Sequence, residues 1–388
     1  MNQNQNLKVA IIAPFDLKKI YGNTLRPIQE AKGLLANKFK CFAVFCLEKN
    51  PAFKFRQIKI SKGPFCWLPD FLRKKDINYL YDFLFSKKIR LEKLPPVIHL
   101  HNYYSISVIP SSYQGKIITD WHGFKSLDLK NKCRRYLSFN PKNLLYSLII
   151  IPFVEKLERK SLQRADKIIA AAANIQKDIN KIFPQYKNKV IVINNPVIPQ
   201  NFLLNKHQNK FNVGAIGPFS HENNKVIKTI ISIAQKIPEI EFKLAGELEK
   251  KTKKEVEKIR NIKVLGWISE KQYRLFLSRI GVLLLPYFGP KKFGGTRNKL
   301  IQAAASGTPI ISTIDGARGF KEKKYLYLAD TRKQIEQFIR KLGRNIDLRK
   351  KTGENLKRAV FKNYHYKIEA RKLIDLYKEL EQNSKKKR

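Results

Sequence analysis

A glycine pair followed by two basic residues is the part of this sequence best suited to chemistry. Gly294 and Gly295 lack a Cβ and let the main chain approach a ligand closely. We expect Thr296 to cap a helix that starts there, so that free backbone amides and the positive end of the helix dipole face the ligand. Arg297 and Lys299 add mobile positive charge beside those amides. Together these features suit a diphosphate, and an ordinary glycine-rich turn with solvated bases is the alternative.

The glycine pair belongs to a unit of loop, helix and strand that recurs along the chain. Gly307 is expected to end the helix, and residues 309–312 are typical of a buried parallel strand. Apolar runs predict further strands at residues 7–13, 41–46, 97–100, 117–119, 167–171 and 190–193, and near residues 213, 242, 264, 282, 310 and 326. Helices are expected at residues 25–36, near residues 225, 254, 272, 300 and 334, and at residues 366–382.

This alternation of strands and helices predicts an α/β fold with parallel, doubly wound sheets, in which ligands bind at the carboxyl ends of the strands. With 388 residues and 43% apolar content, the chain is long enough to bury two cores. We expect domains at residues 1–200 and 201–362, and a closing helix with a basic tail at residues 363–388. Prolines and polar residues between positions 196 and 210 mark the expected linker.

The stretch GGTRNKLIQAAASGTPIIST, which begins at Gly294, resembles the signature segment of family 4 glycosyltransferases. Other pieces of the family pattern occur in the same order at residues 212–217, 242–246, 264–267 and 282–286, and more weakly at residues 120–123, 164–169 and 190–196. The resemblance implies the GT-B fold, in which two Rossmann-like domains face each other across a cleft. It also implies transfer of a sugar from a nucleotide-sugar donor to a glycan or lipid-linked acceptor, with retention of the anomeric configuration.

In the first half of the chain, the resemblance gives roles to two residues. Gly22 follows the first strand and matches the family's glycine loop, which approaches the donor diphosphate and the acceptor. A plain turn is the alternative for Gly22. His122 matches a histidine that contacts the transferred sugar or its reacting region, and a histidine that merely caps a helix is the alternative.

In the second half, the resemblance places the donor-binding residues in several loops. Gly217 lies in the loop after the first strand of this half. Lys225 opens the next helix, where family members commonly place a base that pairs with phosphate, although this lysine can also be simply solvated. Trp267 and Ile268 fall where family members meet the nucleobase. Packing into the core is the alternative for Trp267.

Gln302 departs from the family pattern, because many members carry a glutamate here that holds the ribose hydroxyls. An amide can hydrogen-bond a diol, but without the charge-assisted strength of a carboxylate. Arg318 also stands where an acidic residue is common in the family. The departure at Gln302 supports a competing hypothesis, a catalytically weak GT-B protein that binds nucleotide, glycan or membrane without turnover.

The expected chemistry needs positive charge at the leaving diphosphate. Arg297, Lys299 and the helix-start amides can supply it, so we expect no metal and no cofactor other than the nucleotide-sugar co-substrate. The absence of an Asp-x-Asp motif agrees with this expectation. His99 and His101 alternate on a strand and face one side, but a metal pair here lacks a third ligand nearby in the sequence.

The chain is strongly basic, with 78 Lys and Arg against 31 Asp and Glu and a formal net charge of +47. Such a charge attracts polyanions, and a lysine-rich bias of the source proteome is the alternative explanation. Nucleic acid is the weaker candidate partner, because no zinc-finger or RNP pattern occurs. Residues 124–167 combine bases and aromatics with an apolar run at residues 144–154, which suits an anionic membrane surface. An ordinary buried helix explains the apolar run equally well.

The remaining features concern the location of the protein. Its N-terminus is polar and lacks the regions of a signal peptide, and no apolar run is long enough to span a membrane. The four cysteines show no Cys-x-x-Cys spacing, which indicates reduced thiols. We therefore expect a cytoplasmic protein, peripheral on the inner face of the membrane where a lipid-linked acceptor is presented.

Overall fold

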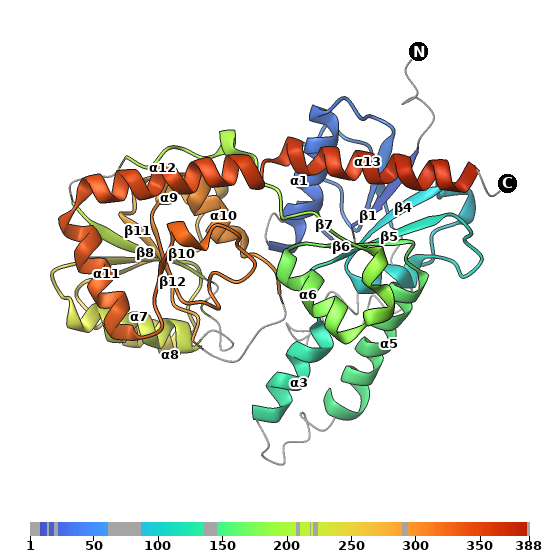
Figure 1. Ribbon diagram of the computed structural model, residues 1–388. Coiled ribbons are helices and arrows are strands. Elements are labelled where there is room, and N and C mark those ends of the chain that lie inside the picture. Colours follow the sequence, from blue (N-terminus) through green and yellow to red (C-terminus); the bar gives the residue numbers. More distant parts are fainter. Residues whose placement is uncertain are drawn as a thin grey trace. The chain divides into compact units, whose positions relative to one another are not determined.

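The computed structural model describes residues 8–13, 15–18, 22–60, 87–135, 146–206, 210–217, 219, 224–288 and 294–385. The chain divides into two compact units (Figure 1). The first consists of Met1–Pro196, Phe293–Gly295 and Tyr366–Arg388, and the second of Val197–Lys292 and Thr296–His365. Each unit contains its own sheet and its own core, and each is described by itself.

The first unit contains a parallel sheet in which seven strands are described, in the order β3-β2-β1-β4-β5-β6-β7. The strands are β1 (Val9–Ile12), β2 (Phe42–Cys46), β3 (Gln57–Lys59), β4 (Val97–His101), β5 (Lys116–Trp121), β6 (Lys167–Ala170) and β7 (Val190–Val192). The helices are α1 (Gly22–Ala36), α3 (Lys125–Arg135), α5 (Ile151–Arg164), α6 (Ala173–Ile182) and α13 (Tyr366–Lys385). The order reverses between β1 and β4, which makes their carboxyl ends the switch point of this sheet.

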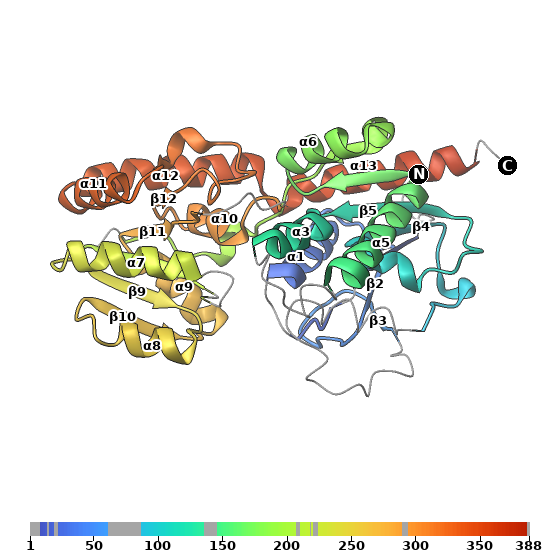
Figure 2. The same ribbon diagram turned by 90° about the horizontal axis from the view of Figure 1, so that it is seen from below.

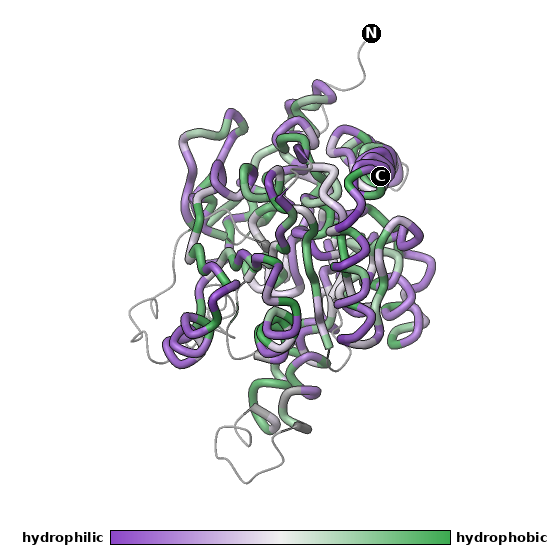
Figure 3. Tube along the Cα trace, turned by 90° about the vertical axis from the view of Figure 1, so that its left-hand side faces the viewer, coloured by the Kyte–Doolittle hydropathy of each residue, from purple (hydrophilic) through white to green (hydrophobic). Residues whose placement is uncertain are grey.

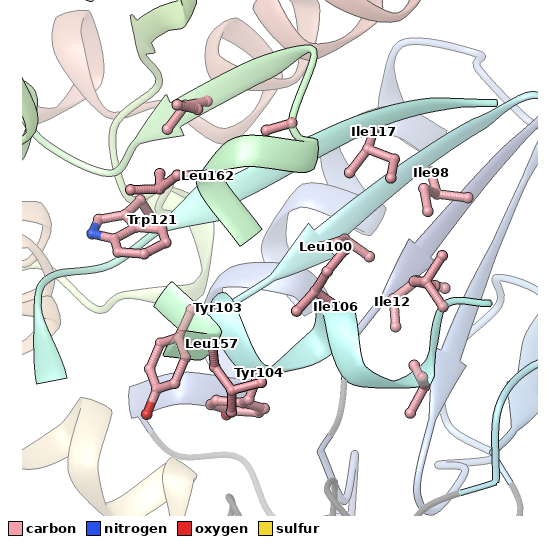
Figure 4. Close-up of a cluster of buried hydrophobic side chains, with 14 of the residues drawn as sticks. Ile12, Ile98, Leu100, Tyr103, Tyr104, Ile106, Ile117, Trp121, Leu157 and Leu162 are labelled. Carbon is pink, nitrogen blue, oxygen red and sulfur yellow. The ribbon is translucent and has the colours of Figure 1, made fainter. Parts of the chain in front are cut away.

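Both faces of this sheet are covered, as continuous apolar strands require. Ala10 and Ile12 of β1 join one core cluster, with residues of α5 and α6. Figure 4 shows part of this cluster, including Ile12 and Trp121. Val9 and Ile11 alternate to the other face and pack in a second cluster with residues of α1 and α13. The predicted parallel, doubly wound sheet is confirmed for this unit.

Helices α1 and α13 lie against each other although they come from opposite ends of the sequence (Figure 1). Gly33 allows this close approach, because a Cβ at its position would lie 2.6 Å from the carbonyl oxygen of Tyr366 and 2.7 Å from the Cβ of Ala370. The expected closing helix therefore packs against the sheet of the first unit. Its sequence is largely polar, and the tube is coloured accordingly near the C-terminus (Figure 3).

The second unit contains a parallel sheet with six described strands in the order β10-β9-β8-β11-β12-β13. The strands are β8 (Asn212–Ile216), β9 (Glu241–Ala245), β10 (Ile262–Gly266), β11 (Val282–Leu285), β12 (Ile310–Ser312) and β13 (Tyr327–Leu328). The helices are α7 (Asn224–Lys236), α8 (Lys250–Val256), α9 (Glu270–Arg279), α10 (Asn298–Ala305), α11 (Arg332–Arg344) and α12 (Ile346–Asn363). Core residues of α7 and α11 pack together in one cluster, and those of α9, α10 and α12 in another. Figure 2 shows these helices around the sheet of the second unit.

Short helical turns complete the described structure. They are the 3-10 helices η1 (Leu91–Lys93), η2 (Tyr103–Val108), η4 (Pro184–Lys189), η5 (Pro199–Asn201) and η7 (Lys323–Tyr325), and the π-helix η3 (Tyr146–Ile150). None of the helices in the described part of the chain combines the length and the apolar character that a membrane span needs.

Two sequence-based expectations about the elements were wrong. Helix α1 begins at Gly22 and not near Leu25, so Gly22 lies in a first helical turn and not in a loop. The first turn of a helix has no internal partners for its amides, and glycine and asparagine are tolerated there. Thr296 is not the N-cap of helix α10. That helix begins at Asn298, and its N-cap is Arg297, which has an extended backbone and makes no side-chain capping hydrogen bond.

Candidate active site

The switch point of the second sheet lies between β8 and β11, which are parallel neighbours. Gly217 follows the carboxyl end of β8, and Tyr287 follows that of β11 two residues after Leu285. Ligands of doubly wound sheets bind at such a point, because the connections leave the sheet in opposite directions and open a crevice. Residues that gather here are therefore the candidates for ligand binding.

Lys299 of α10 reaches this switch point. Its Nζ donates hydrogen bonds to the carbonyl oxygens of Ile216, at 2.6 Å, and Gly217, at 3.1 Å, and to the hydroxyl of Tyr287, at 3.1 Å. An ammonium has only donors, so the two carbonyls are well suited to hold it. Lys299 thus fixes the loop after β8 and brings a positive charge to it. The sequence-based expectation that this charge is mobile was wrong, because the two carbonyls hold Nζ in place.

Arg297 stands beside Lys299. Its guanidinium lies 3.7 Å from the centre of the Tyr287 ring, and its Nη2 lies 3.4 Å from Oδ2 of Asp315. Stacking on an aromatic face leaves the edge of a guanidinium free to donate, which is the geometry in which arginine binds phosphate. The side chain keeps 21% exposure. The sequence predicted Arg297 and Lys299 together, and the structure brings both to the ring of Tyr287.

Gly294 and Gly295 belong to the first unit by their contacts. Gly294 forms an antiparallel bridge with Gly123, and its carbonyl accepts a hydrogen bond of 3.0 Å from Nδ2 of Asn174. A Cβ at Gly295 would come within 3.0 Å of Cδ1 of Ile175. Close packing against the side chain of Ile175 therefore accounts for part of the requirement for glycine at position 295.

Gln302 of α10 does not point freely into solvent. The hydroxyl of Tyr273 donates a hydrogen bond of 2.7 Å to its Oε1. Burial raises the pKa of Tyr273, so this hydroxyl keeps its proton. One end of the Gln302 amide is thus occupied, and its Nε2 is left as the group that can donate to a ligand.

The other predicted donor-binding residues differ in exposure. Trp267 follows Gly266 at the end of β10 and is 73% exposed, which excludes core packing as its role. Ile268 is half-buried against the core cluster of α9 and α10. Lys225 is exposed on the first turn of α7.

The first unit gathers a buried group of charged and imidazole side chains at the carboxyl ends of β4 and β5. Arg26 and Glu30 come from α1, His99 and His101 from β4, and Asp120 from β5. All of these side chains are at most 1% exposed. Nε of Arg26 lies 2.6 Å from Oδ2 of Asp120 and 3.0 Å from Oε1 of Glu30. Arg26 is the main counterion of both carboxylates.

His122 follows β5 directly and lies at the edge of this buried group. Its Nε2 is 3.5 Å from Oδ1 of Asp120, and its side chain keeps 23% exposure. The ring of His101 meets it edge to face at 5.9 Å between centroids. Burial lowers the pKa of His122 to about 4, and Asp120 offsets this effect only in part. His122 is therefore a neutral imidazole near neutral pH.

Glu30, His99, His101 and Asp120 form the group among the described residues whose side chains can hold a metal ion, with ligand atoms within 4.8 Å of one another. Their geometry argues for a different role. Nε2 of His101 lies 3.0 Å from Glu30 and its Nδ1 lies 3.6 Å from Asp120, so the two carboxylates face opposite nitrogens of one ring. Arg26 already supplies positive charge to both carboxylates, and it would repel a metal ion placed beside it.

Glu158 of α5 holds the helix that follows His122. Its Oε1 accepts hydrogen bonds from the amides of Lys125, at 2.8 Å, and Ser126, at 3.2 Å, and its Oε2 accepts one of 2.6 Å from the Ser126 hydroxyl. The carboxyl group therefore caps the N-terminus of α3. Burial nevertheless raises the pKa of Glu158 to about 7, because desolvation outweighs these hydrogen bonds.

The residues predicted to meet a membrane are only partly described. Leu148 is 67% and Ile149 is 59% exposed in η3, whereas Ile151 and Val154 of the same apolar run are buried. The buried-helix alternative is thus correct for the second part of the run. Tyr136, Phe139 and the start of the run lie outside the described residues.

Sequence reasoning missed six residues of these sites: Arg26, Glu30, Asp120, Tyr273, Tyr287 and Asp315. Tyr287 could have been found, because it directly follows a buried strand that neighbours the first strand of its sheet. The roles of the other five depend on contacts with residues far away in the chain, which the sequence does not reveal.

Comparison with known proteins agrees with this geometry. Residues 210–347 match the family model described as "Glycosyl transferases group 1". Sucrose-phosphate synthase from Thermosynechococcus elongatus superimposes with a TM-score of 0.73 at 16% identity, covering 97% of this chain and 100% of that one. WaaG, a glycosyltransferase involved in lipopolysaccharide biosynthesis, gives 0.67 at 12% identity, covering 95% and 99%. HepE of Anabaena, in complex with UDP and glucose, gives 0.64 at 14% identity, covering 96% and 100%.

No curated protein sequence matches the chain significantly. The two parallel α/β sheets and the structural matches define a protein of the GT-B class. The group 1 glycosyltransferase domain at residues 210–347, together with this fold, indicates a glycosyltransferase enzyme. Membership of family 4 is consistent with these findings.

Proposed function

We propose that the enzyme transfers a sugar from a nucleotide-sugar donor to a hydroxyl of a glycan or lipid-linked acceptor, with a nucleoside diphosphate as the leaving group. The observation that carries this proposal is the placement of Arg297 and Lys299 around Tyr287 at the switch point of the second sheet. Two fixed positive charges at such a point stabilise a developing diphosphate anion.

Further observations support a uridine nucleotide among the donors to be tested. HepE has been solved with UDP and with UDP-glucose, and it shares the fold of this chain. The exposed ring of Trp267 offers a flat apolar surface of the kind on which a nucleobase can stack. Gln302, with its Oε1 occupied by Tyr273, offers a donor to the ribose hydroxyls.

We further propose a metal-independent, retaining reaction in which His122 contacts the sugar or the reacting hydroxyl. Arg297 and Lys299 supply the charge that a metal ion would otherwise bring to the diphosphate. We place the enzyme in the cytoplasm, where the exposed Leu148 and Ile149 and the net charge of +47 suit an anionic membrane surface that carries a lipid-linked acceptor.

A nucleotide-release assay with a panel of UDP-, GDP- and ADP-sugars, with and without EDTA, tests the proposal. We expect release from one donor class, insensitive to EDTA and strongly reduced by Arg297→Ala. Lys271→Ala is a matched control, since Lys271 is an exposed lysine of α9. Saturable nucleotide binding without release from any donor, in the presence of glycan and lipid acceptors, would favour the competing hypothesis of a binding protein, for which Gln302 is the supporting observation.

A further inference from the structure

The two oxygens of the buried Asp120 carboxylate have different neighbours. Oδ2 accepts a hydrogen bond of 2.6 Å from Nε of Arg26, and it faces His99 Nε2 and His101 Nδ1, each at 3.6 Å. Oδ1 faces Nε2 of His122 at 3.5 Å. The carboxylate therefore separates a structural side, which is turned toward α1 and β4, from a side that is turned toward His122.

The hydrogen-bond partners of His99 fix its tautomer. The hydroxyl of Tyr377, from α13, lies 2.8 Å from Nδ1 of His99. Burial raises the pKa of Tyr377 well above its usual value, so the hydroxyl keeps its proton. Nε2 of His99 faces a carboxylate oxygen, which can only accept, so the hydroxyl donates its hydrogen bond to Nδ1. The proton of the neutral His99 ring is then on Nε2, which points toward Oδ2 of Asp120.

His101 is fixed by similar reasoning. Its Nε2 lies 3.0 Å from Oε2 of Glu30, and a carboxylate oxygen can only accept, so this nitrogen carries a proton. Oδ2 of Asp120 accepts the hydrogen bond from Arg26 at 2.6 Å and faces Nε2 of His99 at 3.6 Å. Oδ1 is left as the acceptor of this carboxylate for a donor from the side of His122.

We propose that Asp120 is a positioning residue that holds His122 as the Nε2–H tautomer, leaving Nδ1 of His122 as an acceptor for a substrate hydroxyl. Nε2 of His122 and Oδ1 of Asp120 are both buried, and neither has a close hydrogen-bond partner among the described residues. Closing their 3.5 Å separation satisfies both atoms at once. The His122 side chain keeps 23% exposure, so part of it can meet a ligand.

Burial keeps this imidazole neutral, although the carboxylates of Asp120 and Glu30 favour its protonated form. The groups that face it are Asp120 from β5, His101 from β4, and Arg26 and Glu30 from α1. Glu369 and Tyr377 of α13 lie behind Arg26 and His99. Burial, Arg26 and His101 all lower the pKa of His122, which reaches about 4. A neutral ring with a fixed tautomer can accept a hydrogen bond from a hydroxyl, which an imidazolium cannot do.

This inference rests on the proposed function for the identity of the hydroxyl, which belongs to the transferred sugar or to the acceptor. The tautomer of His122, however, can be measured without any catalytic activity. Histidine tautomers are read directly from long-range 1H–15N NMR spectra of the ring nitrogens in the full-length wild-type protein. We expect the resonances of His122, assigned by their loss in His122→Gln, to show a protonated Nε2 and an unprotonated Nδ1 at neutral pH.

Asp120→Asn tests the consequence for catalysis. The amide group can turn its NH2 toward Nε2 of His122, which favours the Nδ1–H tautomer and removes the acceptor. We expect a kcat lower by roughly 10- to 100-fold, from the loss of one hydrogen bond to the substrate, with the donor KM changed much less. Thr119→Ser, a mild change at the neighbouring position of β5, is the matched control and should keep the wild-type kcat.

The outcomes separate the inference from the proposed function. An Nδ1–H tautomer of His122 in the wild-type spectrum would overturn the inference, whether or not the enzyme is active and whether or not Asp120→Asn folds. An Asp120→Asn protein that is folded and has wild-type kcat would overturn it as well. A wild-type protein that releases no nucleotide from any donor, yet shows the expected tautomer, would contradict the proposed function alone.

Discussion

Lys299 donates a hydrogen bond of 2.6 Å from its Nζ to the carbonyl oxygen of Ile216, the last residue of β8. The lysine therefore does two things at once. It holds the loop that begins at Gly217, and it keeps a positive charge at the switch point of the sheet. A phosphate that binds here meets a charge whose position is fixed before the ligand arrives, which limits the entropy lost on binding.

Lys299→Ala should weaken donor binding and lower turnover while leaving the fold intact. The substitution removes a charge from the site and leaves the carbonyls of Ile216 and Gly217 to water. We expect donor affinity to fall by roughly 10- to 100-fold, because the diphosphate loses a fixed positive charge and the loop after β8 loses its hydrogen bonds to Lys299. Titration calorimetry and circular dichroism measure the two effects. Unchanged kinetics of Lys299→Ala would show that Lys299 does not help to bind the donor phosphates.

Arg297→Lys should be almost as harmful as Arg297→Ala. Lysine keeps the charge, but it cannot stack flat on Tyr287 as the guanidinium does at 3.7 Å, and it loses the planar set of donors. Steady-state kinetics with the best donor should show both variants at least roughly 10-fold below the wild type in kcat/KM. Full activity of Arg297→Lys would mean that a point charge suffices and that the stacking is incidental.

Gln302→Glu should tighten donor binding. A carboxylate in this place still accepts the hydrogen bond from Tyr273, and its other oxygen accepts from the ribose diol with charge-assisted strength. The expected gain is about 1 kcal/mol, or roughly five- to tenfold in Kd. Gln235→Glu, on the exposed side of α7, makes the same change of charge away from the site and serves as control. Equal or weaker binding by Gln302→Glu would refute the role assigned to this position.

Trp267 should report nucleotide binding by its fluorescence. It is 73% exposed, whereas Trp121 is buried in the first core. We expect donor nucleotide to change the emission of the wild type and not that of Trp267→Leu, whose free energy of unfolding should stay within about 0.5 kcal/mol of the wild type. A nucleotide-dependent signal that survives in Trp267→Leu would show that the base binds elsewhere.

Glu158→Gln should change how stability depends on pH. The pKa of Glu158 is raised from 4.5 to about 7, so between these values the folded state holds a proton that the unfolded state has released. The protonated carboxyl group of Glu158 thus adds its full contribution to the free energy of unfolding below pH 4.5, and this contribution is lost as the pH rises to about 7. Its size is on the order of 3 kcal/mol.

Urea denaturation of the wild type and Glu158→Gln at several pH values between 5 and 8 measures this effect. Relative to the glutamine variant, the wild type should lose free energy of unfolding as the pH rises, and the loss should level off above pH 7. A difference between the two proteins that stays constant over the whole range would contradict the raised pKa of Glu158.

Much of the fold could be predicted because buried parallel strands leave continuous apolar runs in the sequence. Val9–Ile12 and Val282–Leu285 are fully buried strands of this kind. β3, at Gln57–Lys59, was missed because it is short, partly exposed and polar at both ends. α12, at Ile346–Asn363, was missed because charged residues and Gly353 interrupt its apolar face.

Site residues could be predicted only where they lie close to one another in the sequence. The pair of Arg297 and Lys299 is visible in the sequence, and so is the common side of His99 and His101. The carboxylate beside these histidines is not, because it comes from the strand register that sets His101 opposite Asp120. A helix cap at Thr296 was expected from residue type alone, and the extended conformation of Arg297 moved the start of α10 beyond it.

Calorimetric titration of the nucleoside diphosphate that the best donor releases tests the central claim most directly, because it isolates the cationic switch point from acceptor chemistry. The account predicts saturable binding at one site in the wild type and in Lys271→Ala, and its near loss in the double variant Arg297→Ala/Lys299→Ala with the fold retained. Wild-type affinity in that double variant would contradict the claim that these two side chains bind the diphosphate.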